Sequence, residues 1–211
     1  MIIPKKENIA RTSEEDPLNR YYTPILRHFY LKRLKLVLDQ LGNAYCDNLL
    51  EIGYGSGIFL PELSKKCHHL YGVDIHDRIN IVEEMLEKEK TDAILSKGDI
   101  LHLDYEPEIF DIIVCVSVLE HIEDLTTAIN EVHRVLKKKG VFVLGFPTNS
   151  KALNLYFKMI NLNPNWHAHS TSHTKIMERI KKSFRIERIL RFPQILPTSF
   201  SLYFICKCIK E

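Results

Sequence analysis

Apolar residues follow two spacings that alternate along most of the chain. Recurrence at every third or fourth position is typical of helices, and short continuous apolar runs are typical of strands buried on both faces of a sheet. The pattern predicts helices at residues 24–41, 59–67, 78–89 and 124–140, and strands at residues 47–53, 70–75, 93–100, 110–120 and 141–147. Strands that alternate with helices predict an α/β fold with a mostly parallel, doubly wound sheet.

The helix predicted at residues 124–140 carries signals at both ends. Asp124 is suited to cap its first turn, and the lysines near its other end favour the negative pole of the helix dipole. Gly140 fits the position that follows the last turn, and Gly42 ends the helix at residues 24–41 in the same way. Both glycines are therefore predicted to follow helices.

The two ends of the chain break the alternation. The runs at residues 184–192 and 200–209 are β-like and have no helix between them, which predicts an antiparallel hairpin at the edge of the sheet. Residues 1–20 are mostly polar and contain two prolines, so we expect a flexible N-terminal arm there. The length of 211 residues predicts that residues 21–211 form a single domain.

Charge and cysteine content narrow the functional classes. The formal net charge is +2, from 29 Lys and Arg against 27 Asp and Glu, and this near-neutral balance disfavours a nucleic-acid partner. No apolar run approaches the roughly 20 residues of a membrane-spanning helix, and the start of the chain lacks the plan of a signal peptide, so we expect a cytoplasmic protein. The five cysteines form no C-x-x-C pair, which predicts neither a disulfide framework nor a structural zinc site.

Residues 51–57 read E-I-G-Y-G-S-G and follow an apolar run, as is typical of a loop that approaches a nucleotide. The dinucleotide fingerprint G-x-G-x-x-G/A fits Gly53 and Gly55, but its third position falls on Ile58. Glu51 would repel a pyrophosphate and suits a ligand with positive charge at that end. S-adenosylmethionine carries an ammonium and a sulfonium and no phosphate, so the loop favours it over a nicotinamide dinucleotide.

Asp74 ends the next predicted strand. A carboxylate at this place accepts hydrogen bonds from both hydroxyls of a ribose, which either nucleotide would supply. Asp74 therefore predicts a ribose, which is compatible with both S-adenosylmethionine and a nicotinamide dinucleotide.

Several motifs occur in one order and together resemble the class I S-adenosylmethionine-dependent methyltransferases, in particular the small-molecule type with an E-H-I segment. The resemblance runs from about Tyr21 to the C-terminus. It rests on E-x-G-x-G-x-G at 51–57, V-D-I at 73–75, G-D-I at 98–100, F-D-I-I-V-C-V-S-V-L-E-H-I at 110–122 and R-V-L-K-K-K-G-V-F-V-L-G-F-P at 134–147. The family implies a Rossmann-like, seven-stranded sheet in the order 3-2-1-4-5-7-6, with strand 7 antiparallel and helices on both faces.

The resemblance also implies residues for the methionine part of the cofactor. Gly53, Gly55 and Gly57 would line it, and Glu51 would lie near its ammonium. Ser117 would contact the amino-acid end through its backbone or its hydroxyl. S-adenosyl-L-methionine is then the expected cofactor and S-adenosyl-L-homocysteine the expected product.

The adenosine part would contact the ends of the second and third strands. Asp74 would hold the ribose, and Ile75 would pack against the adenine. Asp99 would accept a hydrogen bond from the adenine amino group, with the backbone of Ile100 nearby. The remaining residues that the resemblance assigns to the cofactor are tyrosines: Tyr21 or Tyr22 before the first long helix, and Tyr54 at a position where the family varies.

Two histidines are candidates for a general base, which is needed only if the acceptor holds its proton tightly. His121 follows the fourth predicted strand at the expected ligand end of the sheet, although packing or capping of a helix explains it as well. His169 lies in an H-x-H-x3-H segment with His167 and His173. This segment contains no Asp, Glu or Cys, so we favour a wall of the acceptor site over a metal site, with a solvated loop as the alternative.

Residues 148–173 contain an apolar stripe at helical spacing, followed by Trp166. Most such stripes are core, but this one follows the fifth strand, so we hypothesise a lid over an apolar acceptor. The stripe consists of Leu153, Tyr156, Phe157 and Ile160.

The sequence thus predicts a methyltransferase for a small-molecule or lipid-like acceptor. The alternatives are a protein or RNA methyltransferase and an inactive S-adenosylmethionine-binding protein. A nicotinamide oxidoreductase is disfavoured by Glu51 and Ile58. The sequence leaves open the acceptor, the methylated atom, the use of a base and the oligomeric state.

Overall fold

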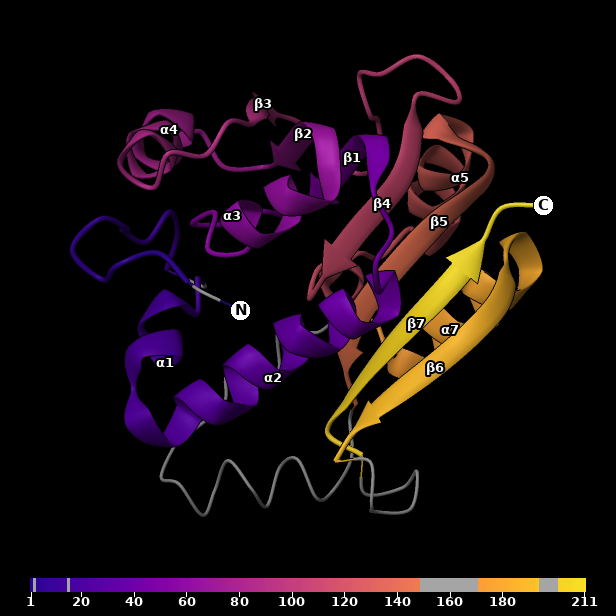
Figure 1. Cartoon of the computed structure of the whole chain (residues 1–211). Coiled ribbons are helices and arrows are strands. Elements are labelled where there is room, and N and C mark those ends of the chain that lie inside the picture. The colour runs from indigo at the N-terminus through magenta and orange to yellow at the C-terminus, as the bar shows by residue number, and fades with distance from the viewer. Residues whose placement is uncertain (2, 15, 149–170, 194–200) are drawn as a thin grey trace.

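The computed structural model describes residues 1, 3–14, 16–148, 171–193 and 201–211. A seven-stranded sheet in the order β3-β2-β1-β4-β5-β7-β6 forms its centre (Figure 1). β7 runs antiparallel to both of its neighbours, and the other pairs are parallel. The predicted sheet, its strand order and its antiparallel seventh strand are confirmed. The strands are β1 (Cys46–Ile52), β2 (Cys67–Asp74), β3 (Ile94–Lys97), β4 (Phe110–Val116), β5 (Leu136–Pro147), β6 (Arg185–Phe192) and β7 (Tyr203–Ile209).

Helices cover both faces of the sheet, as predicted. One face carries α1 (Leu18–Tyr22), α2 (Pro24–Leu41), α3 (Leu60–Leu63) with the 3-10 turn η1 (Ser64–Lys66), and α4 (Ile79–Lys88). The other face carries α5 (Leu125–Val135) and α7 (His173–Ser183), and the 3-10 turn η2 (Leu119–His121) follows β4. In Figure 1, α2 crosses in front of the sheet while α5 lies behind it. Within the described parts of the chain, none of the helices is long and apolar enough to cross a bilayer.

Neighbouring residues of the central strands contribute to different faces of the core. Leu49 and Leu50 of β1 are both fully buried. Leu49 packs with the helices α1 to α4, whereas Leu50 packs with α5 and α7. The continuous apolar runs of the sequence therefore reflect strands buried on both sides.

Most of the predicted boundaries are confirmed. α2 spans Pro24–Leu41, and Gly42 follows it with φ +58°, a backbone conformation that favours glycine. The Asp124 carboxylate caps α5 by accepting a hydrogen bond from the Thr127 amide over 3.0 Å. These local signals act within one turn, so the sequence alone predicts them well.

The predicted end of the helix at residues 124–140 is wrong. α5 ends at Val135 and β5 begins at Leu136, so Gly140 lies inside a strand. Leu136 is fully buried and pairs with Phe110 of β4, and its carbonyl accepts a hydrogen bond from Nζ of Lys210. These long-range contacts stabilise an extended backbone more than the helix propensity of the lysines stabilises another turn.

The predicted N-terminal arm has contacts with the rest of the domain. Ile9, Thr12 and Leu18 are buried. Nδ2 of Asn8 donates a hydrogen bond to Oε1 of Glu89, just beyond the end of α4, over 2.8 Å. The boundary between arm and domain at residue 20 stays a prediction.

Candidate functional site

A cavity of about 460 Å³ lies at the carboxyl ends of β1, β2, β3 and β4. Doubly wound sheets bind ligands at this edge, near the point where the strand order reverses. Eleven of the residues that the sequence assigns to the cofactor or to a general base line the cavity, whereas Gly57 is not among its lining residues and His169 lies outside the described residues. The eleven are Tyr21, Glu51, Gly53, Tyr54, Gly55, Asp74, Ile75, Asp99, Ile100, Ser117 and His121.

The glycine loop is shaped by two close approaches. Gly53 has φ +77°, and a Cβ added to it would lie 2.2 Å from Cγ2 of Val118. Gly57 also has φ +77°, and a Cβ there would lie 2.6 Å from Cγ1 of Val82 and 2.8 Å from Cε of Met85. Gly57 thus allows the loop to pack against α4, and the ligand contact expected of it stays a prediction.

Glu51 is buried near the end of β1, with 4% of its surface exposed. Its Oε2 atom has no hydrogen-bond partner among the described residues. Burial, with a smaller contribution from the Asp74 carboxylate, raises the pKa of Glu51 to about 8. Buried polar atoms are nearly always paired, so an unpaired acceptor in a cavity wall indicates where a ligand donor or a water molecule belongs.

Asp74 is held beside the glycine loop by backbone donors. Its Oδ2 accepts a hydrogen bond from the Gly55 amide over 2.7 Å, and its Oδ1 accepts one from the His76 amide over 3.3 Å. The Tyr54 ring packs edge-on against the His76 ring at 5.0 Å, and the Tyr54 hydroxyl is buried without a partner among the described residues. The carboxylate is therefore fixed at the cavity wall.

The loop after β3 supplies another carboxylate. Oδ1 of Asp99 accepts a hydrogen bond from the Leu101 amide over 2.9 Å, and Ile100 is buried. Ile75, after β2, is 72% exposed even though it lines the cavity. A large apolar side chain left open at a cavity offers a surface for a flat ring.

Arg33 of α2 also lines the cavity, and sequence reasoning missed it. Its Nη1 donates a hydrogen bond to Oγ of Ser117 over 3.0 Å, and its Nη2 donates one to the Tyr21 hydroxyl over 3.2 Å. Its guanidinium lies 4.3 Å from the centre of the Tyr30 ring. Its Nε is buried without a partner among the described residues, so the wall holds a cation with hydrogen-bonding capacity left.

The spacing of α2 contained a signal for Arg33. The basic segment at residues 27–35 suggests a solvated helix face. However, Arg33 lies four residues after Phe29 and four before Val37, both of which are buried. It therefore belongs to the apolar face of the helix, where a charged residue is unusual.

A polar cluster next to Arg33 follows the end of β4. Ser117 has φ +59°, and its hydroxyl lies 2.7 Å from that of the buried Tyr203. Glu120 is buried as well, and burial raises its pKa to about 8 although its own backbone, Arg33 and Ser117 oppose that shift. The Arg33 charge thus has a carboxyl group in its neighbourhood, although Glu120 is not among the residues that line the cavity.

The histidines are divided between the cavity and other parts of the chain. His121 lines the cavity, and His173 begins α7, where burial lowers its pKa. His167 and His169, like most of the predicted lid at residues 148–173, lie outside the described residues. Among the residues that the structure does describe, no three His, Cys, Asp or Glu side chains gather as a metal site would require.

Comparison with known proteins relates this geometry to a family. The family described as "Methyltransferase domain" matches residues 50–144. An uncharacterized protein of Methanocaldococcus jannaschii is 31% identical over 127 residues, which are 58% of this chain and 52% of the relative. The ubiquinone biosynthesis O-methyltransferase of Aeromonas salmonicida is 24% identical over 135 residues, which are 61% of this chain and 54% of the relative. The chain therefore spans about half the length of the curated relatives it matches.

A solved structure shares the fold. The N-methyltransferase NodS of Bradyrhizobium japonicum, in complex with S-adenosyl-L-homocysteine, superposes with a TM-score of 0.67 at 21% identity, covering 95% of this chain and 94% of NodS. The expected resemblance is thus confirmed by the matched family and by the fold. Residues 50–144 match the methyltransferase-domain family, and the chain shares the fold of the S-adenosyl-L-homocysteine-bound N-methyltransferase NodS.

Proposed function

We propose that the protein is an S-adenosylmethionine-dependent methyltransferase that acts on a small-molecule or lipid-like acceptor. The observation that carries this proposal is Glu51, whose buried Oε2 has no partner among the described residues in the wall of the cavity. A cationic donor of the ligand would satisfy this atom. A phosphate would leave it unpaired and add repulsion.

The amino-acid part of S-adenosylmethionine fits the charges at this end of the cavity. Glu51 would hold the ammonium. Arg33, whose buried Nε has no partner among the described residues, would hold the carboxylate with the help of Ser117 and Tyr21. One anionic and one cationic wall residue thus match a zwitterion, because each charge of the ligand meets its opposite.

The adenosine part fits the other wall. Asp74 would accept hydrogen bonds from the ribose hydroxyls, and Asp99 would accept one from the adenine amino group. The exposed Ile75 side chain would pack on the adenine ring. Ile100 closes this end with its buried side chain.

When bound, S-adenosylmethionine supplies a methyl group on a sulfonium, which activates it for in-line displacement. The chain would hold the acceptor in line with that methyl group and exclude water. His121 lines the cavity and is a candidate to accept the proton of a hydroxyl acceptor. His169 is the second candidate.

The similarity to ubiquinone biosynthesis O-methyltransferases supports a small-molecule acceptor with a hydroxyl group. The apolar stripe predicted within residues 148–173 supports an acceptor with lipid-like character. Together they favour this class over a protein or an RNA.

Titration calorimetry tests the cofactor. We expect S-adenosylhomocysteine to bind the full chain with micromolar affinity and NAD⁺ not to bind. Asp74→Asn should weaken the binding of S-adenosylhomocysteine by about 1–3 kcal/mol, the cost of an unpaired buried hydrogen-bonding group. Asp77→Asn is the matched control, because Asp77 is exposed and outside the cavity. Binding of NAD⁺ in place of S-adenosylhomocysteine would refute the proposal.

Incubation of a cell extract with methyl-labelled cofactor and the chain tests the acceptor. Label in the lipid or small-molecule fraction is expected. Label in protein or RNA would favour the corresponding alternative. Cofactor binding without label in any fraction would indicate a binding protein that has no activity.

A further inference from the structure

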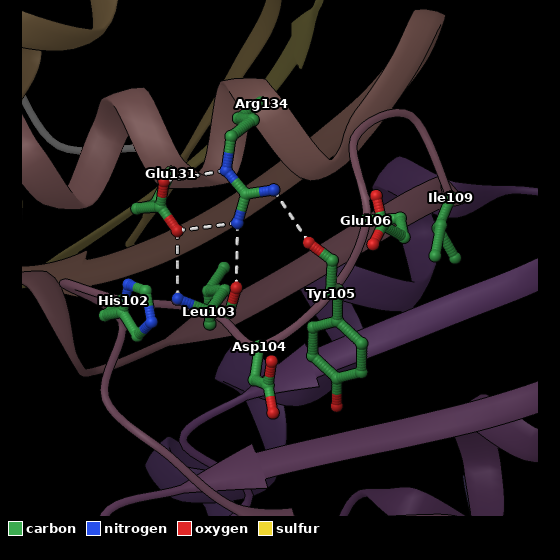
Figure 2. Close-up of a pocket in the computed structure, with 8 residues that line it drawn as sticks. All are labelled: His102, Leu103, Asp104, Tyr105, Glu106, Ile109, Glu131 and Arg134. Carbon is green, nitrogen blue, oxygen red and sulfur yellow. Dashed lines mark hydrogen bonds and ion pairs between the residues drawn. The ribbon is translucent and has the colours of Figure 1, made fainter.

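A second hollow, of about 540 Å³, lies between α5 and the loop that joins β3 to β4 (Figure 2). Glu131 and Arg134 reach from α5 to the backbone of this loop. Nη1 of Arg134 donates a hydrogen bond to the Tyr105 carbonyl and Nη2 donates one to the Leu103 carbonyl, each over 2.7 Å. Oε2 of Glu131 accepts a hydrogen bond from the Leu103 amide over 2.9 Å. Glu131 and Arg134 are thus engaged in holding the loop.

Glu131 and Arg134, here called the α5 clamp, also fix one another. Nε of Arg134 donates to Oε1 of Glu131, and its Nη2 donates to Oε2, both over 2.8 Å. The hydrogen bonds from Arg134 lower the pKa of Glu131. A planar guanidinium paired in this two-point manner has a defined orientation, which a single lysine ammonium would not have.

The loop held by the clamp is the one that carries Asp99. The clamp engages both the amide and the carbonyl of Leu103, whose side chain is buried. The next residue toward β3 is His102, whose amide donates a hydrogen bond to the Asp99 carbonyl over 2.9 Å. The Leu101 amide bonds the Asp99 carboxylate itself. Only three residues of hydrogen-bonded turn therefore separate the clamped backbone from Asp99.

We infer that the α5 clamp positions Asp99 and thereby sets the selectivity of the cavity for adenine over a 6-oxopurine. This inference rests on the proposed function, in which Asp99 accepts from the adenine amino group. A carboxylate only accepts hydrogen bonds, so it attracts a 6-amino group and repels a 6-oxo group. Glu131 and Arg134 do not line the cavity with Asp99, so they would act through it as positioning residues.

The test compares two ligands by calorimetry, S-adenosylhomocysteine and S-inosylhomocysteine, which differ in the group at position 6. We expect Arg134→Gln to weaken the binding of S-adenosylhomocysteine about tenfold and to leave that of S-inosylhomocysteine nearly unchanged. In an Asp99→Asn background, the same change should have less than about a twofold effect, because coupled residues are not additive. Arg179→Gln, which removes an exposed hydrogen bond from α7 to Asn130 of α5, is the matched control.

The outcomes separate the two proposals. If the wild-type chain does not bind S-adenosylhomocysteine, the proposed function fails. If it binds, two results would overturn the inference and leave the clamp a structural role only. In the first, Arg134→Gln weakens the binding of both ligands equally. In the second, Arg134→Gln weakens the binding of S-adenosylhomocysteine equally in the wild-type and the Asp99→Asn backgrounds. If Arg134→Gln does not fold, Glu131→Gln serves instead. Its amide oxygen still accepts from the Leu103 amide, whereas the ion pair and the hydrogen bond from Nε of Arg134 to the second carboxylate oxygen are lost. This variant should shift the selectivity about threefold in the same direction.

Discussion

Replacing Glu51 with Gln removes one negative charge from the cavity and keeps the shape of the side chain. In the unfolded chain Glu51 ionises near its ordinary pKa of 4.5, whereas burial in the folded chain raises the pKa to about 8. Between these values the folded chain binds more protons than the unfolded chain. The contribution of Glu51 to the free energy of unfolding therefore falls as the pH rises from about 4.5 to about 8.

The size of this effect follows from the shift. One pKa unit corresponds to about 1.4 kcal/mol, so ionising Glu51 in the empty cavity costs on the order of 5 kcal/mol, before water that enters the cavity lowers it. Glu51→Gln has no charge to ionise. Its free energy of unfolding should match that of the wild type near pH 5 and exceed it by about 2–4 kcal/mol at pH 8.5.

Urea unfolding of both chains at pH 5 and pH 8.5 measures the difference. Glu120, whose pKa is raised in the same direction, is present in both chains and cancels in the comparison. Asp77→Asn is the control for losing a carboxylate at an exposed position. A difference between Glu51→Gln and the wild type that is the same at both pH values would show that Glu51 ionises normally and would refute the reasoning from burial.

The same variant should bind the ligand more weakly. At pH 6.5 the Glu51 carboxyl is protonated in the empty cavity, so forming an ion pair with the ligand ammonium must release about one proton. Calorimetry of S-adenosylhomocysteine in two buffers of different ionisation enthalpy counts that proton. We expect close to one for the wild type and none for Glu51→Gln, together with an affinity about tenfold lower or more. Equal proton release from both chains would remove Glu51 from the ammonium site.

Two further predictions concern Arg33 and Gly57. Arg33→Met should weaken the binding of S-adenosylhomocysteine about tenfold or more. It should leave the binding of 5′-methylthioadenosine, which lacks the amino-acid part, unchanged. Equal losses of affinity for both ligands in calorimetry would mean that Arg33 has only a packing role. Gly57→Ala should lower the free energy of unfolding by about 1–3 kcal/mol, because its Cβ would meet Val82 and Met85 at 2.6 and 2.8 Å and φ is +77°. Unchanged urea unfolding would contradict that packing role.

The fold could be predicted from the sequence because most of its elements are specified locally. α2 and β4 are recognised from apolar spacing alone, and Gly42 and Asp124 mark helix ends through bonds within one turn. The end of α5 could not be predicted in this way. Leu136 is extended because it pairs with Phe110 and binds Lys210, which are 26 and 74 residues away in the sequence. Such contacts exist only once the sheet has formed.

The residues of the candidate site show the same contrast between local sequence signals and long-range packing. Glu51 and Asp74 could be predicted because a parallel sheet brings the carboxyl ends of its strands to one edge, and Asp99 was implied by the resemblance to the family. Arg33 had only an indirect signal, its place on the apolar face of α2, because the packing that turns this face toward the cavity is not visible in the sequence. The role of the clamp of Glu131 and Arg134 is harder still to predict from the sequence. These side chains contact the backbone of a loop, and backbone contacts do not require particular side-chain types in that loop.

The energetics of Glu51 connect the fold to the ligand. A buried carboxylate without a partner is costly in the empty domain, and an uncharged residue of the same shape would make the chain more stable. Folding alone therefore does not account for this residue at the end of β1. A cationic ligand does, because it supplies the missing donor and stabilises the ionised form. The carboxylate that costs stability in the empty cavity also makes the site selective. A ligand that carries phosphate at this place would be repelled by the like charges of Glu51 and Asp74. A residue that destabilises the empty site thus helps to specify what fills it.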